Sequence, residues 1–110
     1  MIECQRYGMI LKIRPERIDE YKKYHKKIWV DVAKMITACN INNYSIYLKD
    51  EYLFSYFEYT GDNYEADMAK MAADPVTQKW WEIMMPMQEA LPTRNEGEWW
   101  AEMEEVFHQD

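Results

Sequence analysis

Two neighbouring segments rich in aromatic residues constrain the fold of this chain more than any other feature. They run from Tyr44 to Leu48 and from Tyr52 to Tyr59, and the short polar link Lys49-Asp50-Glu51 joins them. Aromatic and β-branched residues favour strands, and a short polar link between two such runs favours a tight turn. The pattern therefore predicts a β-hairpin in the middle of the chain.

Helical patterns lie on both sides of this hairpin. The segment Pro15–Ile36 carries apolar side chains at steps of three and four, and Asn40 is suited to the left-handed conformation that ends a helix. A second helical segment, Tyr64–Met85, is interrupted at Asp74-Pro75, where Asp can cap a helix and Pro fits a first turn. We expect one long helix before the hairpin and one interrupted helix after it.

Strand periodicity marks both ends of the chain. Apolar residues alternate with other residues over Arg6–Ile13, the segment Ala101–His108 alternates in a similar way, and the polar segment Pro92–Gly97 predicts a loop. The element order β-α-β-β-α-β predicts an α+β, ferredoxin-like fold, a four-stranded antiparallel sheet with its helices on one face. At this length we expect one domain over residues 1–110.

The face of this sheet that the helices leave uncovered is expected to be apolar. The strand over residues 52–59 places Phe57 and Tyr59 on one face, and Phe54 and Tyr56 on the other. A bare apolar sheet face predicts a partner. We therefore expect a homodimer that pairs sheet to sheet about a two-fold axis, as in dimeric α/β-barrels.

Charge, glycine and cysteine content exclude several kinds of partner and site. There are 13 Lys and Arg against 20 Asp and Glu, a formal charge of −7, so nucleic acid and membranes are not expected partners. The three glycines are isolated, so no phosphate loop can be built. Cys4 and Cys39 suit neither a disulfide framework nor a metal site, and neither a signal core nor a membrane helix of about 18 apolar residues is recognisable. We expect a reduced, cytoplasmic protein without a metal.

His25 is the residue best suited to proton transfer. It lies on the apolar stripe of the first helical pattern, one turn after Tyr21, so the two side chains point the same way. Imidazole is the side chain whose ordinary pKa lets it give and accept protons near neutrality. A packed helix histidine without a chemical role is the alternative. His108, two residues from the C-terminus, is expected to be a solvated tail residue.

The other candidates are aromatic. Trp80 and Trp81 are adjacent, so on a helix they point about 100° apart, and we expect one in the core and the other at a rim or pocket. An indole beside a cavity can hold the apolar face of a sugar ring, whereas a structural role for both is the alternative. Trp99-Trp100 can likewise be interpreted as a sugar-binding surface or as a structural pair, and its position beside a loop adds an interface or a lid as further possible roles. Tyr44 and Tyr47 lie on opposite faces of one strand, so at most one faces the helices.

Four blocks of these residues, in this order and spacing, resemble the L-rhamnose mutarotase family. They are Tyr21 with His25, Ile28 and Trp29; Asn43 to Tyr47; Trp80-Trp81; and Glu105 to His108. The resemblance runs from about Tyr7 to the C-terminus, and four blocks in register are far more specific than one. The chain departs from the family pattern at Val30-Asp31, where the family often has Pro-Glu.

The resemblance implies a cofactor-free isomerase that interconverts the α and β anomers of L-rhamnose or a similar 6-deoxy-sugar. It implies a proton-donor role for His25 and a sugar-binding role for Tyr21, Tyr44, Trp80 and Trp81. Mutarotation needs a proton on the ring oxygen and removal of one from the anomeric hydroxyl, and the base for the second step stays open. The alternatives are an L-fucose mutarotase of the same family, a cofactor-free monooxygenase or haem-degrading enzyme of the same dimeric fold, and a non-catalytic sugar-binding module.

Overall fold

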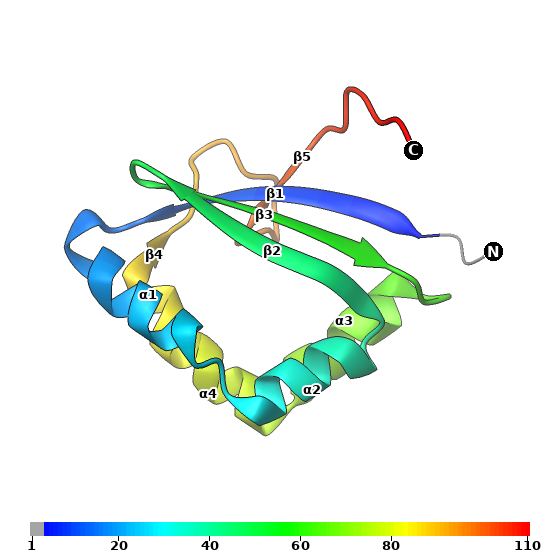
Figure 1. Ribbon diagram of the computed structural model, residues 1–110, viewed down its shortest axis with the longest axis horizontal. Coiled ribbons are helices and arrows are strands. Elements are labelled where there is room, and N and C mark those ends of the chain that lie inside the picture. The colour runs from blue at the N-terminus through cyan, green and yellow to red at the C-terminus, as the bar shows by residue number, and fades with distance from the viewer. Residues whose placement is uncertain (1–3) are drawn as a thin grey trace.

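The computed structural model describes residues 4–110 as an antiparallel sheet with four α-helices on one of its faces (Figure 1). In chain order the elements are β1 (Gln5–Ile13), η1 (Pro15–Arg17), α1 (Ile18–Lys26), α2 (Val30–Ala38), β2 (Ile41–Lys49), β3 (Tyr52–Tyr59), α3 (Tyr64–Ala73), α4 (Pro75–Met84), η2 (Met85–Met87), β4 (Gln88–Glu89) and β5 (Ala101–Met103). Within the described residues, no helix has both the length and the apolar character needed to cross a membrane.

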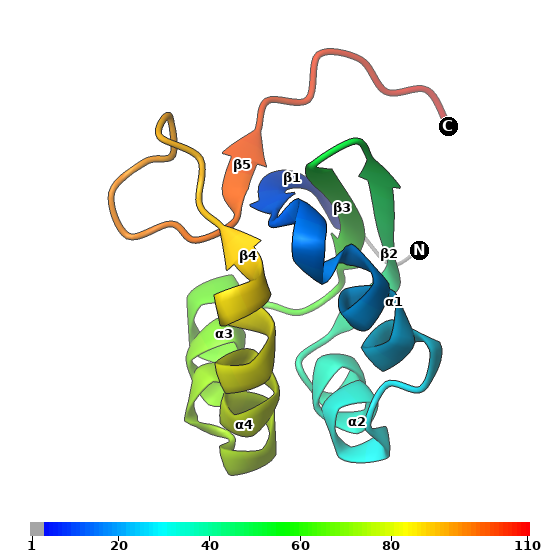
Figure 2. The ribbon, with the colours of Figure 1, turned by 90° about the vertical axis from the view of Figure 1, so that its left-hand side faces the viewer.

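The sheet has the strand order of a ferredoxin-like fold, which confirms the predicted class. Its path is β2-β3-β1-β4, and β5 also pairs with β1. The fourth strand position is filled in two pieces along one edge of β1: β4 lies beside Lys12 and Ile13, and β5 lies beside the segment 8–10. Figure 2 shows the loop between β4 and β5 extending out from this edge.

The expected final strand Ala101–His108 is too long, because β5 ends at Met103. Beyond it the tail leaves the ladder, and Val106 and Phe107 are 88% and 77% exposed. Neither side chain gains the apolar burial within the chain that would hold the tail on the sheet edge.

The predicted hairpin is confirmed, with a first strand that begins three residues earlier, at Ile41. Asp50 in the link has a φ of 55°, as a tight turn requires. A β-bulge interrupts the pairing between Asn42 and Ser45, and Asn43 within it has a φ of 49°. An extra residue on one strand shifts the alternation of side chains. The bulge therefore decides which residues of β2 face the helices.

The prediction of one long helix before the hairpin is wrong, because this segment forms two helices, α1 and α2, with a break at residues 27–29. Trp29 has an extended backbone with φ −61° and ψ 133°, and α2 starts at Val30. Ile28, Trp29 and Val30 are β-branched or aromatic, with low helix propensity. The break brings the Trp29 ring edge-on to Trp80, with the ring centres 5.1 Å apart.

The second helical region is interrupted where expected. Asp74 caps α4, since its carboxylate accepts hydrogen bonds from the Thr77 amide at 2.9 Å and hydroxyl at 2.8 Å. Beneath the sheet, Ile13, Leu53 and Met87 are fully buried and join the sheet to the helices in one core cluster. The core therefore holds α1 and α4 against the same part of the sheet.

Val30→Pro is expected to stabilise the protein by about 0.4–1 kcal/mol. Val30 is the first residue of α2 and is 68% exposed, its amide has no acceptor within the helix, and the extended Trp29 suits a following proline. Thermal unfolding measures the change. Val30→Ala, which removes the side chain without restricting the backbone, should stay within about 0.5 kcal/mol of the parent. A lower melting temperature for Val30→Pro than for Val30→Ala would contradict this.

Candidate functional site

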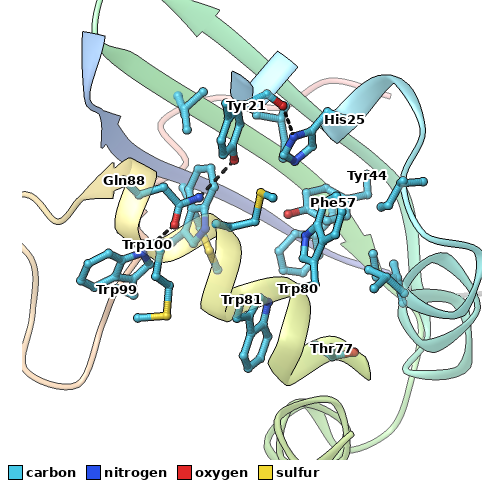
Figure 3. Close-up of a pocket in the computed structure, with 18 of the residues that line it drawn as sticks. Tyr21, His25, Tyr44, Phe57, Thr77, Trp80, Trp81, Gln88, Trp99 and Trp100 are labelled. Atoms are coloured by element: carbon cyan, nitrogen blue, oxygen red, sulfur yellow. Dashed lines mark hydrogen bonds between the residues drawn. The ribbon is translucent and has the colours of Figure 1, made fainter. Parts of the chain in front are cut away.

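One large cavity lies between the sheet and the helices (Figure 3). Its volume is about 860 Å³, near the upper end of the range for drug-sized ligands. Side chains from β1, β2, β3, α1, α2, α3 and α4 line it, together with Gln88 at the start of β4 and Trp99-Trp100 before β5.

All five residues to which the family resemblance gives a role line this cavity. Tyr21 and His25 come from α1, Tyr44 from β2, and Trp80 and Trp81 from α4. Residues 59 positions apart, such as Tyr21 and Trp80, therefore meet because α1 and α4 cover neighbouring parts of the same sheet face.

The orientation of His25 follows from its hydrogen bond to its own helix. Its Nδ1 lies 2.8 Å from the Tyr21 carbonyl oxygen, and its ring stacks on the Tyr21 ring with centres 4.2 Å apart. A carbonyl oxygen can only accept, so Nδ1 carries the hydrogen and neutral His25 has its lone pair on Nε2. Burial lowers the pKa of His25, and the bond to the Tyr21 carbonyl partly opposes this shift. At neutral pH the imidazole is therefore a neutral base.

Tyr21 joins three parts of the site. Its buried ring belongs to the core, and its hydroxyl accepts a hydrogen bond from Gln88 Nε2 at 3.1 Å. Gln88 Oε1 in turn accepts from Trp99 Nε1 at 2.8 Å. Burial raises the pKa of Tyr21 to about 12, although the bond from Gln88 lowers it. The phenol is therefore a neutral hydrogen-bonding group at physiological pH.

The adjacent tryptophans separate as expected, one in the core and one at the rim. Trp80 is 5% exposed and packs in the core with Met84 and Met87, whereas Trp81 is 37% exposed at the cavity. The Trp80 ring also lies edge-on to His25, with the ring centres 5.4 Å apart. Trp80 therefore supports the imidazole from the core side, and Trp81 is free to contact a ligand.

Tyr44 faces the helices and Tyr47 faces away, as their opposite positions on the strand require. Tyr44 lines the cavity, with its ring edge-on to Phe57 at 5.8 Å, whereas Tyr47 pairs with Phe54 and is 66% exposed. As a whole Tyr44 is 41% exposed, yet its hydroxyl group is desolvated. This raises the pKa of Tyr44, and the nearby phenol of Tyr21 adds to the effect.

Two further side chains, Gln88 and Trp99, take part in the site. Gln88 has no recognisable pattern around it in the sequence. Its place becomes clear only from its pairing with Ile13, which belongs to the buried face of β1. Trp99 had several possible roles, and here it lines the cavity. His108 lies outside the cavity, with its Nε2 2.7 Å from Asp110.

The cavity lining is almost free of charge. Among the described residues that line it, Lys22 is the one charged side chain. Within residues 4–110, no three His, Cys, Asp or Glu side chains lie close enough together to hold a metal ion. What the lining offers a ligand is an imidazole base, phenol and amide hydrogen bonds, and indole faces. Such a set can bind an uncharged polyhydroxylated molecule and move a proton on it.

Comparisons with known proteins agree with this chemistry. The family model described as L-rhamnose mutarotase matches residues 6–109. The L-rhamnose mutarotase of Oceanobacillus iheyensis is 32% identical over 108 residues, which cover 96% of this chain and 99% of the relative. The crystal structure of an L-rhamnose mutarotase from Formosa agariphila superposes with a TM-score of 0.76 at 21% identity, over 96% of this chain and 99% of the other.

The fold is also shared with a protein whose name indicates different chemistry. Tetracenomycin F2 cyclase from Streptomyces glaucescens, a type-II polyketide cyclase, superposes with a TM-score of 0.72 at 11% identity, covering 96% of this chain and 97% of the cyclase. At such identity the likeness concerns the fold alone.

Proposed function

We propose that this chain, which belongs to the L-rhamnose mutarotase family, interconverts the α and β anomers of L-rhamnose or a closely similar 6-deoxy-sugar. One observation carries the proposal: in a cavity with an almost uncharged lining, His25 is a neutral base whose Nδ1 is occupied by the Tyr21 carbonyl. Its Nε2 is then the ring nitrogen left for a substrate.

His25 can serve both proton transfers of the reaction in turn. Neutral Nε2 takes the proton of the anomeric hydroxyl, and the imidazolium gives it to the ring oxygen as the bond from C1 to that oxygen breaks. A carbonyl forms at C1, the open-chain aldehyde rotates about C1–C2, and the reverse steps close the ring on the other face. The proton count balances with one imidazole. We therefore infer that the base that removes the proton from the anomeric hydroxyl is His25 itself. Its role as proton donor to the ring oxygen is then the second step of the same catalytic cycle.

The sugar-binding roles divide among the aromatic residues. Tyr21 and Tyr44 have hydroxyls that stay neutral at physiological pH and can bond to sugar oxygens. We assign the stacking role to Trp81, because it is the half-exposed indole at the cavity, while buried Trp80 holds the imidazole in place.

A cofactor-free monooxygenase is the second candidate, and the cavity volume favours it. About 860 Å³ lies near the upper end of the range of about 300–1,000 Å³ found for ligand cavities, so a substrate larger than a 6-deoxy-sugar would also fit. The polar groups of Tyr21, His25 and Tyr44 at one part of the cavity favour the sugar instead. Oxygen uptake on addition of a quinol would support the monooxygenase and count against the mutarotase.

His25→Ala is expected to slow the exchange between the anomers of L-rhamnose by about 100-fold or more, the contribution typical of general acid–base catalysis. Saturation-transfer NMR on the equilibrium mixture measures this exchange directly. A panel that includes L-fucose and D-sugars tests the choice of sugar. His108→Ala removes the exposed histidine and is the matched control, with a rate equal to that of the parent.

Two outcomes would contradict the proposal in different ways. If His25→Ala retains the parental rate, the assignment of His25 fails. If the parent binds L-rhamnose without accelerating anomer exchange, the protein is a sugar-binding module and not an isomerase.

We further propose that the chain is a homodimer that pairs through the outer face of the sheet. Tyr47 and Phe54 lie side by side on that face, and the row continues to Ile10 of β1. Tyr47 is 66% exposed, and the apolar tail residues Val106 and Phe107 are exposed as well. An apolar surface of this kind is typical of an interface.

Tyr47→Asp is expected to shift the protein from dimer to monomer, because it places a charge in the proposed apolar interface. Size-exclusion chromatography with light scattering measures the mass. Val30→Asp introduces the same charge at an exposed position on α2, and this variant should stay dimeric. A monomeric parent protein would refute the interface.

A cytoplasmic location is the remaining part of the proposal. It is supported by Cys4 and Cys39, which are both free, as expected in a reducing compartment. Cell fractionation is the measurement that checks it, and recovery outside the cytoplasm would contradict it.

A further inference from the structure

Gln88 is a buried amide held between two other side chains of the cavity. Trp99 Nε1 donates to its Oε1 at 2.8 Å, and its Nε2 donates to the Tyr21 hydroxyl oxygen at 3.1 Å (Figure 3). Gln88 opens β4, and Trp99 follows the loop that returns the chain to the sheet edge. Three segments distant in sequence therefore form one chain of hydrogen bonds.

The direction of these hydrogen bonds is determined by the indole. Indole Nε1–H can donate but cannot accept, so the amide end beside Trp99 must be the oxygen. The NH₂ end of Gln88 then faces Tyr21, and the phenol oxygen is the acceptor. Since a phenol has one hydrogen, the Tyr21 hydroxyl retains that hydrogen for a partner in the cavity.

We propose that Gln88 and Trp99 are positioning residues that make the Tyr21 hydroxyl a hydrogen-bond donor to the ring oxygen of the sugar. The inference rests on the proposed mutarotase function and extends it. A hemiacetal centre has one hydroxyl, which can donate, and one ring oxygen, which can only accept. His25 Nε2 is an acceptor for the first. The Tyr21 hydroxyl donates a hydrogen bond to one lone pair of the second, and the other lone pair receives the proton from the imidazolium.

The placement of the two groups fits this pairing. The Tyr21 and His25 rings stack with centres 4.2 Å apart, and both side chains line the same cavity. Donation from Gln88 also strengthens the phenol as a donor, because hydrogen bonds in a chain polarise one another. The same bond lowers the pKa of Tyr21 against the effect of burial.

Gln88→Glu keeps the shape of the side chain but reverses the direction of the hydrogen bond between residue 88 and the Tyr21 hydroxyl. At neutral pH the introduced carboxylate accepts from both Trp99 and Tyr21, so the phenol hydrogen turns away from the sugar. We expect kcat/KM for anomer exchange to fall about tenfold, in keeping with the loss of one hydrogen bond. Burial raises the pKa of a carboxyl group, so lowering the pH protonates the introduced side chain. The neutral acid again accepts from Trp99 and donates to Tyr21.

The diagnostic quantity is the ratio of kcat/KM between Gln88→Glu and the parent, measured from pH 8 to about pH 5. Titration of His25 changes the rate of both proteins, so they are compared as a ratio at each pH. We expect the ratio to rise toward one as the pH falls. Gln78→Glu makes the same chemical change at an exposed position on α4, and its ratio should stay near one throughout. Circular dichroism checks that each variant is folded.

Trp99→Phe provides a second test that needs no buried charge. It keeps an aromatic ring but removes the donor that orients Gln88, so kcat/KM should fall several-fold. A parental rate in Trp99→Phe, or a Gln88→Glu ratio that is the same at every pH, would overturn the inference. A parent that does not accelerate anomer exchange at all would refute the proposed function instead.

Discussion

The burial of Tyr21 is the constraint on which the rest of the site depends. Its carbonyl oxygen accepts a hydrogen bond from Nδ1 of His25, and its ring stacks on the imidazole. Its hydroxyl oxygen accepts a hydrogen bond from the side-chain amide of Gln88. Each contact uses a different part of the residue. Tyr21 thus decides where the imidazole hydrogen sits, how the ring is oriented, and which groups of the cavity accept or donate. A tyrosine can do this without introducing charge into the core, since burial raises its pKa to about 12.

The site and the core of the protein are made from the same side chains. Tyr21 and Trp80 belong to the buried cluster that includes Leu53 and Met84, and the Trp80 ring lies against His25. Packing that stabilises the fold therefore also keeps the imidazole in place, which is what a proton-transfer site requires. The break between α1 and α2 contributes because it lets Trp29 pack against Trp80. The strongly acidic surface contrasts with an almost uncharged cavity, as suits a neutral substrate.

Local patterns in the sequence could predict much of this arrangement. Periodicity placed Tyr21 and His25 on one face of a helix, Tyr44 and Tyr47 on opposite faces of a strand, and the tryptophan pair at a core boundary. The helix break escaped prediction because the apolar stripe continues through it, as both helices cover the same core.

Features that depend on pairing between distant segments could not be predicted. The division of the fourth strand into β4 and β5 depends on which part of the β1 edge each segment meets. The role of Gln88 depends on that division, because only the pairing of β4 with Ile13 brings the amide to Tyr21. No local spacing encodes such a contact.

We propose that His25 meets the substrate as a neutral base with Nε2 available. Nitrogen-15 NMR of the imidazole tests this most directly, with the His25→Ala variant to assign the signal. We expect that neutral His25 carries its hydrogen on Nδ1 and that it titrates with a pKa below the ordinary value of about 6.5. A hydrogen on Nε2 in the neutral form, or a pKa above the ordinary value, would contradict it.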